Sequence, residues 1–191
     1  MEAFLTSTAV VTLAEIGDKT QLLAIVLAAR FQKPLVIIAG IFAATVANHF
    51  LAALVGAQVA NLLEGDWFRY LIAASFIAMA AWTLIPDKLE EDEQKPQRFG
   101  AFLATLIAFF LVEMGDKTQI ATVALGARFH DVIPVTMGTT LGMMLANVPA
   151  VFLGHEVLKR VPLNTVRMVA AALFLVIGVW IVAQTAGWMG G

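Results

Sequence analysis

Two copies of one acidic hexapeptide are the part of this sequence best suited to do chemistry. Residues 15–20 read Glu-Ile-Gly-Asp-Lys-Thr, and residues 113–118 read Glu-Met-Gly-Asp-Lys-Thr. Each copy offers two carboxylates, an ammonium group and a hydroxyl, and a glutamine follows each copy. Oxygen ligands of these kinds are preferred by hard divalent cations such as Ca²⁺, Mn²⁺ and Mg²⁺. The residue types therefore predict a cation site, and no catalytic nucleophile is needed to explain them.

Each residue type in the two copies is expected to have its own role at such a site. The two acids of a copy are three positions apart, so on a helix they share one face, and the lysine follows the glutamate by four. Glycine between the acids permits close approach or local unwinding of the backbone. Each copy has a net charge of −1, so one divalent ion would neutralise the two copies together. The expected cation ligands are Glu15, Asp18, Glu113 and Asp116, with Thr20, Gln21, Thr118 and Gln119 as additional ligands, Lys19 and Lys117 for charge balance, and Gly17 and Gly115 as backbone breaks.

The composition indicates where these motifs lie. The chain is 60% hydrophobic and 14% charged, whereas soluble domains carry about 25% charged residues. A net charge of −2 gives no indication of nucleic-acid binding. The absence of cysteine excludes disulfides, thiolate metal sites and cysteine nucleophiles. We therefore expect an all-α integral membrane protein.

The hydrophobic pattern predicts six membrane-spanning helices, since about 20 mainly apolar residues are needed for each span. The N-terminus lacks the basic region of a cleaved signal peptide, so the first apolar stretch is expected to remain as the first membrane helix. The expected spans are roughly residues 3–29, 34–61, 67–86, 99–126, 132–155 and 164–187.

A duplication relates the two halves of the chain. A shift of 98 positions places residues 13–31 over residues 111–129, with 11 of 19 positions identical. Three spans in each copy require the copies to insert with opposite orientation, a plan that recurs in secondary transporters. The expected organisation is two inverted three-helix repeats, residues 1–86 and 99–191, joined by an acidic linker at residues 87–98.

The basic residues predict the orientation of the chain in the inner (plasma) membrane. Lysine and arginine gather on one face and are rare on the other, and the basic face is expected to be cytoplasmic. Both termini are then outside and the linker 87–98 is cytosolic. The cytoplasmic set is Arg30, Lys33, Lys88, Lys95, Arg98, Lys159, Arg160 and Arg167, and the opposite set is Arg69 and Arg128.

Both motifs are expected deep in the membrane. Glu15 follows Ala3 by 12 residues and Glu113 follows Phe99 by 14, which places each about 18–21 Å into a hydrocarbon core about 30 Å thick. A charged group there costs at least about 2.5–3.5 kcal/mol if it faces lipid. The acids must therefore face one another, water or an ion, and an empty site is expected to take up protons and release them when metal binds.

Three polar residues outside the motifs also lie in predicted spans. Asn48 and Asn147 are similar in context, but the 98-residue shift aligns Asn147 with His49 instead. Symmetric metal ligation by the two asparagines is therefore not expected, and hydrogen bonding between helices is the favoured role for them. His49 remains a candidate to face the cation site.

On these two motifs the sequence resembles the Gdt-type family of cation/proton antiporters, whose hallmark is two copies of Glu-x-Gly-Asp-(Lys/Arg)-(Thr/Ser). Both copies are complete here, at residues 15–20 and 113–118, and the resemblance extends over essentially the whole chain. It implies transport of Ca²⁺ and Mn²⁺ in exchange for protons, with the motif acids binding the cation. For a bacterial member of this length, it implies manganese export from the cytosol.

The resulting hypothesis is proton-coupled export of Mn²⁺, or of Ca²⁺, by alternating access. Metal ion, protons and lipid bilayer are the expected partners, with no cofactor beyond the transported ion and no nucleic acid, and a homo-oligomer is compatible with the sequence. A passive divalent-cation channel is the first alternative. An intramembrane hydrolase, in which Asp18 and Asp116 share a proton, fits less well because each copy also carries a glutamate and a lysine. Export of a basic amino acid is the weakest alternative.

Overall fold

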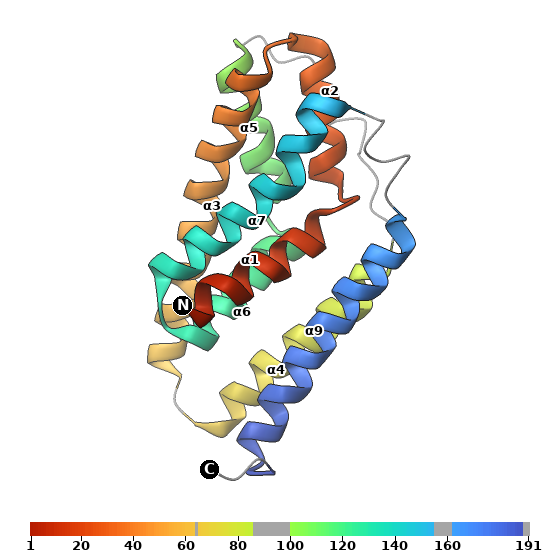
Figure 1. Ribbon diagram of the computed structural model, residues 1–191. Helices are drawn as coiled ribbons and strands as arrows, with labels where there is room; N and C mark the ends of the chain where they lie inside the picture. The colour runs from red at the N-terminus through yellow and green to blue at the C-terminus, as the bar shows by residue number, and fades with distance from the viewer. Residues whose placement is uncertain (64, 86–99, 155–161, 189–191) are drawn as a thin grey trace.

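The computed structural model describes residues 1–63, 65–85, 100–154 and 162–188, and every regular element within these ranges is a helix (Figure 1). The expectation of an all-helical chain is confirmed. The predicted linker at residues 87–98 lies outside the described residues. The helices are α1 (Glu2–Glu15), α2 (Lys19–Phe31), α3 (Pro34–Leu62), α4 (Asp66–Thr83), α5 (Ala101–Glu113), α6 (Lys117–Phe129), α7 (Val132–Leu153) and α9 (Leu163–Thr185).

Among the described helices, three are long and apolar enough to cross a membrane alone: α3, α7 and α9. The helix α5 is apolar but shorter. The expected spans 3–29 and 99–126 are not continuous helices, because each is divided into two helices at its acidic motif. The prediction that the glutamate and aspartate of one motif share a face of one helix is therefore wrong.

The local sequence explains both breaks. Gly17 and Gly115 have φ angles of +82° and +79°, in the left-handed region that side-chain-bearing residues rarely adopt. The residue before each glycine is extended, so the chain leaves the helix there. Gln21 Oε1 accepts a hydrogen bond of 2.9 Å from the Gly17 amide, and Gln119 Oε1 accepts one of 2.6 Å from Gly115. The two copies of the motif therefore share one backbone geometry.

Helices of the two halves pack against each other. α1 packs on α7, and α3 packs on α5, α6 and α7. α4 and α9 run side by side in opposite directions, at the lower right of Figure 1. The broken segments α1–α2 and α5–α6 are therefore each held against a long helix of the other half of the chain.

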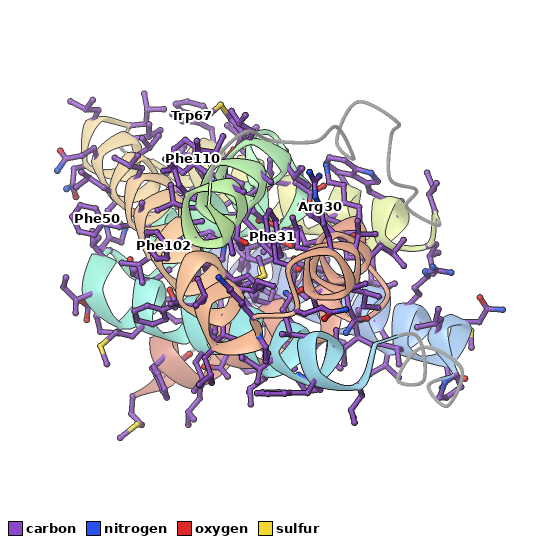
Figure 2. The ribbon with its side chains drawn as sticks, turned by 90° about the horizontal axis from the view of Figure 1, so that it is seen from above. Arg30, Phe31, Phe50, Trp67, Phe102 and Phe110 are labelled. Carbon is purple, nitrogen blue, oxygen red and sulfur yellow. The ribbon has the colours of Figure 1, made fainter. Side chains whose placement is uncertain are left out.

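The outer surface of the bundle is apolar and its interior holds charged groups. Large apolar side chains such as Phe50, Phe102 and Trp67 are exposed (Figure 2), while Glu15 and Glu113 are buried. A water-soluble protein has few contiguous exposed apolar surfaces of this kind. The distribution is that of a helical protein surrounded by lipid.

The backbones of α3 and α6 approach each other closely at two glycines. A methyl group built on Gly56 would lie 2.0 Å from the carbonyl oxygen of Val123, and one built on Gly126 would lie 2.4 Å from the carbonyl oxygen of Ala53. Small residues at helix crossings in membranes permit this kind of approach. Glycine is therefore required from both sides of the contact.

Replacing Gly56 with alanine is expected to force α3 away from α6, because the opposing atoms belong to backbone and cannot turn aside. Overpacking of this kind lowers the free energy of unfolding by about 1–3 kcal/mol. Thermal unfolding of the purified protein in detergent measures the loss. Gly100→Ala is the matched control, since a methyl group there meets no atom within 4 Å. Equal melting temperatures for the two variants would contradict the contact.

Candidate metal centre

Four helix ends meet around the acidic motifs. Glu15 is the last residue of α1 and Glu113 the last of α5, while Asp18 and Asp116 directly precede α2 and α6. One carboxylate oxygen from each of Glu15, Glu113 and Asp116 lies within 4.8 Å of the others, and all three residues are buried. Three of the four predicted acidic ligands are therefore brought together, with a spacing that one metal ion can bridge.

The carboxylate of Glu15 is held by threonines from both motifs. Thr20 Oγ1 donates a hydrogen bond of 2.5 Å to Glu15 Oε2. Thr118 Oγ1 donates to Glu15 Oε1 from the other half of the chain. The two threonines, expected as additional cation ligands, therefore orient one glutamate, and the second of these bonds joins the two halves.

The carboxylate of Glu113 has a different environment. Among the described residues, neither of its oxygens accepts a hydrogen bond, although the side chain is 1% exposed. His49 is a titratable neighbour of this carboxylate, with its Nε2 3.7 Å from Glu113 Oε2. Buried carboxylates normally have hydrogen-bond partners or bind metal. The lone pairs of Glu113 are thus available to a cation, and His49 faces the centre as the sequence suggested.

The two lysines form ion pairs that cross between the motifs. Lys117 Nζ lies 2.5 Å from Asp18 Oδ1, and Lys19 Nζ lies 3.3 Å from Asp116 Oδ1. Each lysine follows a glutamate by four residues, a spacing that favours their pairing on a continuous helix, but the helix ends between the two residues. In this structure each lysine lies beside the aspartate of the opposite motif.

The two glutamines connect the breaks to the long helices. Gln21 Nε2 donates to the carbonyl oxygen of Ala146 on α7 at 2.8 Å, and Gln119 Nε2 donates to Asn48 Oδ1 on α3 at 2.5 Å. Asn48 Nδ2 donates in turn to the carbonyl oxygen of Phe110 on α5 at 3.2 Å. The predicted interhelical hydrogen bonding of Asn48 is confirmed.

Asn147 bonds within its own helix instead. Its Nδ2 donates to the carbonyl oxygen of Met143, one turn earlier on α7, at 3.1 Å. The expectation of a bond between helices is therefore not met at this position, although the side chain is buried. This difference could not be predicted from the residues, because Asn48 and Asn147 both lie in apolar helices of similar composition.

The charges of the centre divide into two groups. Each aspartate has a lysine partner from the opposite motif, whereas Glu15 accepts hydrogen bonds from two threonines and Glu113 lies near His49. Because one lysine balances each aspartate, the net charge of −2 of the two motifs equals the charge of the two glutamates. One divalent cation, or two protons, neutralises this charge.

Known proteins were compared with the whole chain. Residues 3–91 and 101–188 match the family described as "Divalent cation/proton antiporter GDT1". A Vibrio cholerae protein named "Putative manganese exporter" is 52% identical over 176 residues, which are 92% of this chain and 88% of that protein. A GDT1-like protein of Synechocystis is 28% identical over 200 residues, 94% of this chain and 96% of its own length. GDT1-like protein 5 of Arabidopsis thaliana is 27% identical over 217 residues, 94% of each chain.

No solved structure matches the chain. The family match covers both acidic motifs, both helix breaks and the long apolar helices between them. Together with the apolar outer surface, it makes this a multi-pass membrane protein of a transporter family. The chain belongs to the GDT1 family of divalent cation/proton antiporters.

Proposed function

We propose that this protein exports Mn²⁺ from the cytosol in exchange for protons, by alternating access. The observation that carries the proposal is the cluster of Glu15, Glu113 and Asp116, which places three buried carboxylates within 4.8 Å of one another. These three acids hold the transported ion. Asp18, the fourth predicted ligand, is paired with Lys117 in this arrangement and contributes to charge balance.

Charge balance supports exchange of metal for protons. The crossed ion pairs occupy both lysines, so the two glutamates are left to be neutralised by the transported species. Metal binding requires deprotonated carboxylates, so the ion and the protons compete for the same oxygens. In a membrane interior a bare carboxylate is costly, and the site therefore exchanges one kind of cation for the other.

The membrane arrangement we propose has six spans in two inverted repeats, residues 1–86 and 99–191. The segments α1–α2 and α5–α6 each cross the membrane as a broken span, and the repeated glycine geometry and reciprocal helix packing support this symmetry. Discontinuous helices beside the substrate are common in transporters built from inverted repeats. In this arrangement both termini are on the non-cytoplasmic side of the inner membrane and the linker is cytosolic. The distribution of basic residues supports this orientation.

Manganese is the favoured ion because the 52% identical Vibrio cholerae relative carries a manganese exporter's name. The oxygen ligands also suit Ca²⁺, which is the second candidate substrate. Neither ion is a resident cofactor, because each is the transported substrate.

Thr20 and Thr118 contribute to the proposed site by holding the carboxylate of Glu15 in place through hydrogen bonds.

The alternatives fit the geometry less well. A proton-sharing pair of aspartates requires two carboxylates that face each other, whereas Asp18 and Asp116 are each paired with a lysine. An open channel leaves its selectivity filter in contact with water, whereas Glu15, Glu113 and Asp116 are at most 4% exposed. Both observations favour a transporter that encloses its substrate.

Neutralising the glutamates is expected to abolish transport. Glu15→Gln and Glu113→Gln each remove the charge of a proposed ligand. Loss of a residue that only supports a metal ligand already costs about tenfold in affinity or activity, so Mn²⁺ uptake into proteoliposomes should fall by more than about tenfold. Glu2→Gln is the matched control, because Glu2 is exposed at the start of α1. Wild-type flux in folded, inserted Glu113→Gln protein would show that the site is assigned to the wrong residues.

An imposed pH gradient is expected to drive Mn²⁺ movement. Metal and protons compete, so Mn²⁺ affinity rises as pH rises, and flux runs toward the more acidic compartment as protons leave it. Stopped-flow measurement of Mn²⁺ and of internal pH in the same liposomes follows the movement of the metal and the opposite movement of the protons. A Mn²⁺ flux that does not change with the pH gradient would favour the channel instead.

The crossed ion pairs are expected to behave as a unit in a double-mutant cycle. Removing one partner of a buried pair costs about 3–5 kcal/mol, whereas removing both costs much less. Lys117→Gln should therefore destabilise the protein more than Lys117→Gln combined with Asp18→Asn. Lys19 is 20% exposed against 3% for Lys117, so Lys19→Gln should cost less. Thermal unfolding in detergent measures these three variants and the single variant Asp18→Asn, and additive losses for Lys117 and Asp18 would argue against the pair.

A further inference from the structure

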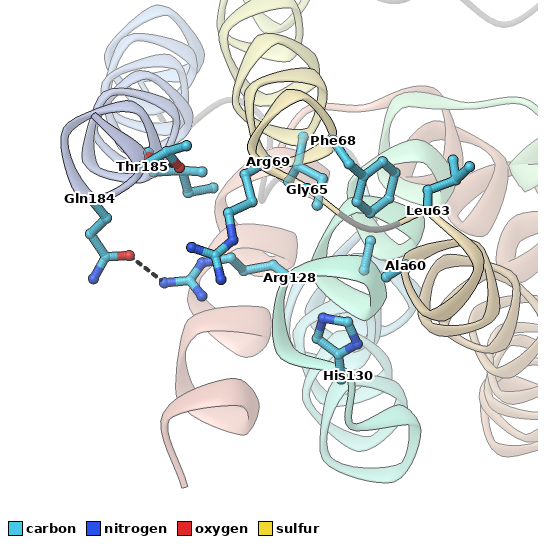
Figure 3. Close-up of a pocket in the computed structure, with 12 residues that line it drawn as sticks. Ala60, Leu63, Gly65, Phe68, Arg69, Arg128, His130, Gln184 and Thr185 are labelled. Atoms are coloured by element: carbon cyan, nitrogen blue, oxygen red, sulfur yellow. Dashed lines mark hydrogen bonds between the residues drawn. The ribbon is translucent and has the colours of Figure 1, made fainter. Parts of the chain in front are cut away.

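A polar cavity lies away from the metal centre, where α3, α4, α6 and α9 have neighbouring ends. It has a volume of about 630 Å³, and its polar lining residues are Arg69, Arg128, His130, Gln184 and Thr185 (Figure 3). Arg128 is 11 residues beyond Lys117 along α6, which places it about 16 Å from the motif at the start of that helix. The cavity is therefore separate from the cluster of acids.

Two arginines face this cavity, and neither is paired with a carboxylate of the described residues. Figure 3 shows Arg69 extending from α4 toward Arg128 at the end of α6, where Arg128 donates a hydrogen bond of 2.9 Å to Gln184 Oε1. Among the described residues that line the cavity none is acidic, and neither guanidinium forms an ion pair with a described residue. Two neighbouring positive charges repel each other, so an anion between them stabilises the arrangement.

Part of the lining of the cavity is apolar and is shared with a neighbouring groove. Phe68, Ile72 and Ala127 line the cavity and also line a groove of about 190 Å³ between α3, α4 and α6. The rest of this groove is almost wholly apolar, and it includes the exposed Leu71. A basic cavity at the helix ends and an apolar groove therefore lie next to each other, with three residues in common.

We propose that this cavity binds the phosphate group of an anionic phospholipid, whose acyl chain lies in the adjoining groove. Guanidinium groups bind phosphate oxygens through paired, charge-assisted hydrogen bonds. Basic pockets between membrane helices bind lipid head groups for this reason. The apolar groove beside the cavity favours a lipid over a free phosphate, because a free phosphate leaves the groove unused.

The duplication provides a matched control. A shift of 98 positions relates Arg69 to Arg167 and Arg128 to Arg30, and neither Arg30 nor Arg167 lines the cavity. The double variant Arg69→Gln with Arg128→Gln removes the same charge as Arg30→Gln with Arg167→Gln. Arg69 is exposed and Arg167 is half-buried, so neither single variant, Arg69→Gln or Arg167→Gln, removes a fully buried side chain, and the two provide a second comparison beside the double variants.

Native mass spectrometry of the full chain in neutral detergent tests the proposal with three probes. These are palmitoyl-oleoyl phosphatidylglycerol, phosphatidylcholine with the same chains, and inorganic phosphate. We expect wild-type protein to bind phosphatidylglycerol more tightly than phosphatidylcholine. Loss of Arg69 and Arg128 should weaken phosphatidylglycerol binding by at least about tenfold, since each hydrogen bond to a charged group is worth roughly that factor. The Arg30 and Arg167 variants should bind like wild type.

Three results would overturn the proposal. Equal binding of the two lipids by wild-type protein would remove the role of the head-group charge. Equal losses in the Arg69 variants and in their Arg167 counterparts would show a general effect of protein charge. Displacement of phosphatidylglycerol by millimolar inorganic phosphate would assign the arginines to a soluble anion instead of a lipid.

Discussion

A carboxylate inside a lipid-facing helical bundle must be neutralised by a cation or a proton, and this constraint organises the centre of the protein. Four motif acids and two motif lysines are gathered where four helix ends meet. Because the lysines cross to the aspartates of the opposite motif, the two halves are joined by their charges as well as by packing. In the transport cycle that we propose, the two glutamates are neutralised by the transported ions. On that proposal the aspartates hold the two halves together through their lysine partners, and the glutamates of the same hexapeptides bind the cargo.

The two glutamates have unequal surroundings although their motifs are almost identical. Both threonines donate to Glu15, and no described residue donates a hydrogen bond to Glu113. The break between α1 and α2 is packed against α9, since a methyl group built on Gly17 would lie 2.7 Å from the side chain of Leu163. A methyl group built on Gly115, at the break between α5 and α6, would meet nothing within 4 Å. The difference therefore arises from the helices that surround each motif. Duplicated sequence provides the same ligands twice, and the fold decides how each set is used.

The helical class, the duplication and the gathering of acids from both motifs could be predicted from residue types and spacing. The site of each break was partly predictable, since Gly17 and Gly115 permit a left-handed backbone. The crossed pairing of Lys19 and Lys117 was not predictable, because spacing rules describe neighbours on one continuous helix and these partners are about 100 positions apart. The approach of His49 to Glu113 likewise depends on how α3 packs against the second motif. Such partners follow from tertiary packing, which a single sequence does not specify.

The glycine contact between α3 and α6 restricts how the protein moves. Backbone atoms touch there from both sides, at Gly56 and at Gly126, so these helices have no space to slide past each other. α3 belongs to the first half of the chain and α6 to the second, so the contact holds one helix of each half together. In the alternating-access cycle that we propose, the chain bends where its helices are interrupted, between α1 and α2 and between α5 and α6. The hinges of the proposed motion then lie beside the proposed ligands, so opening a path to the ion changes its coordination.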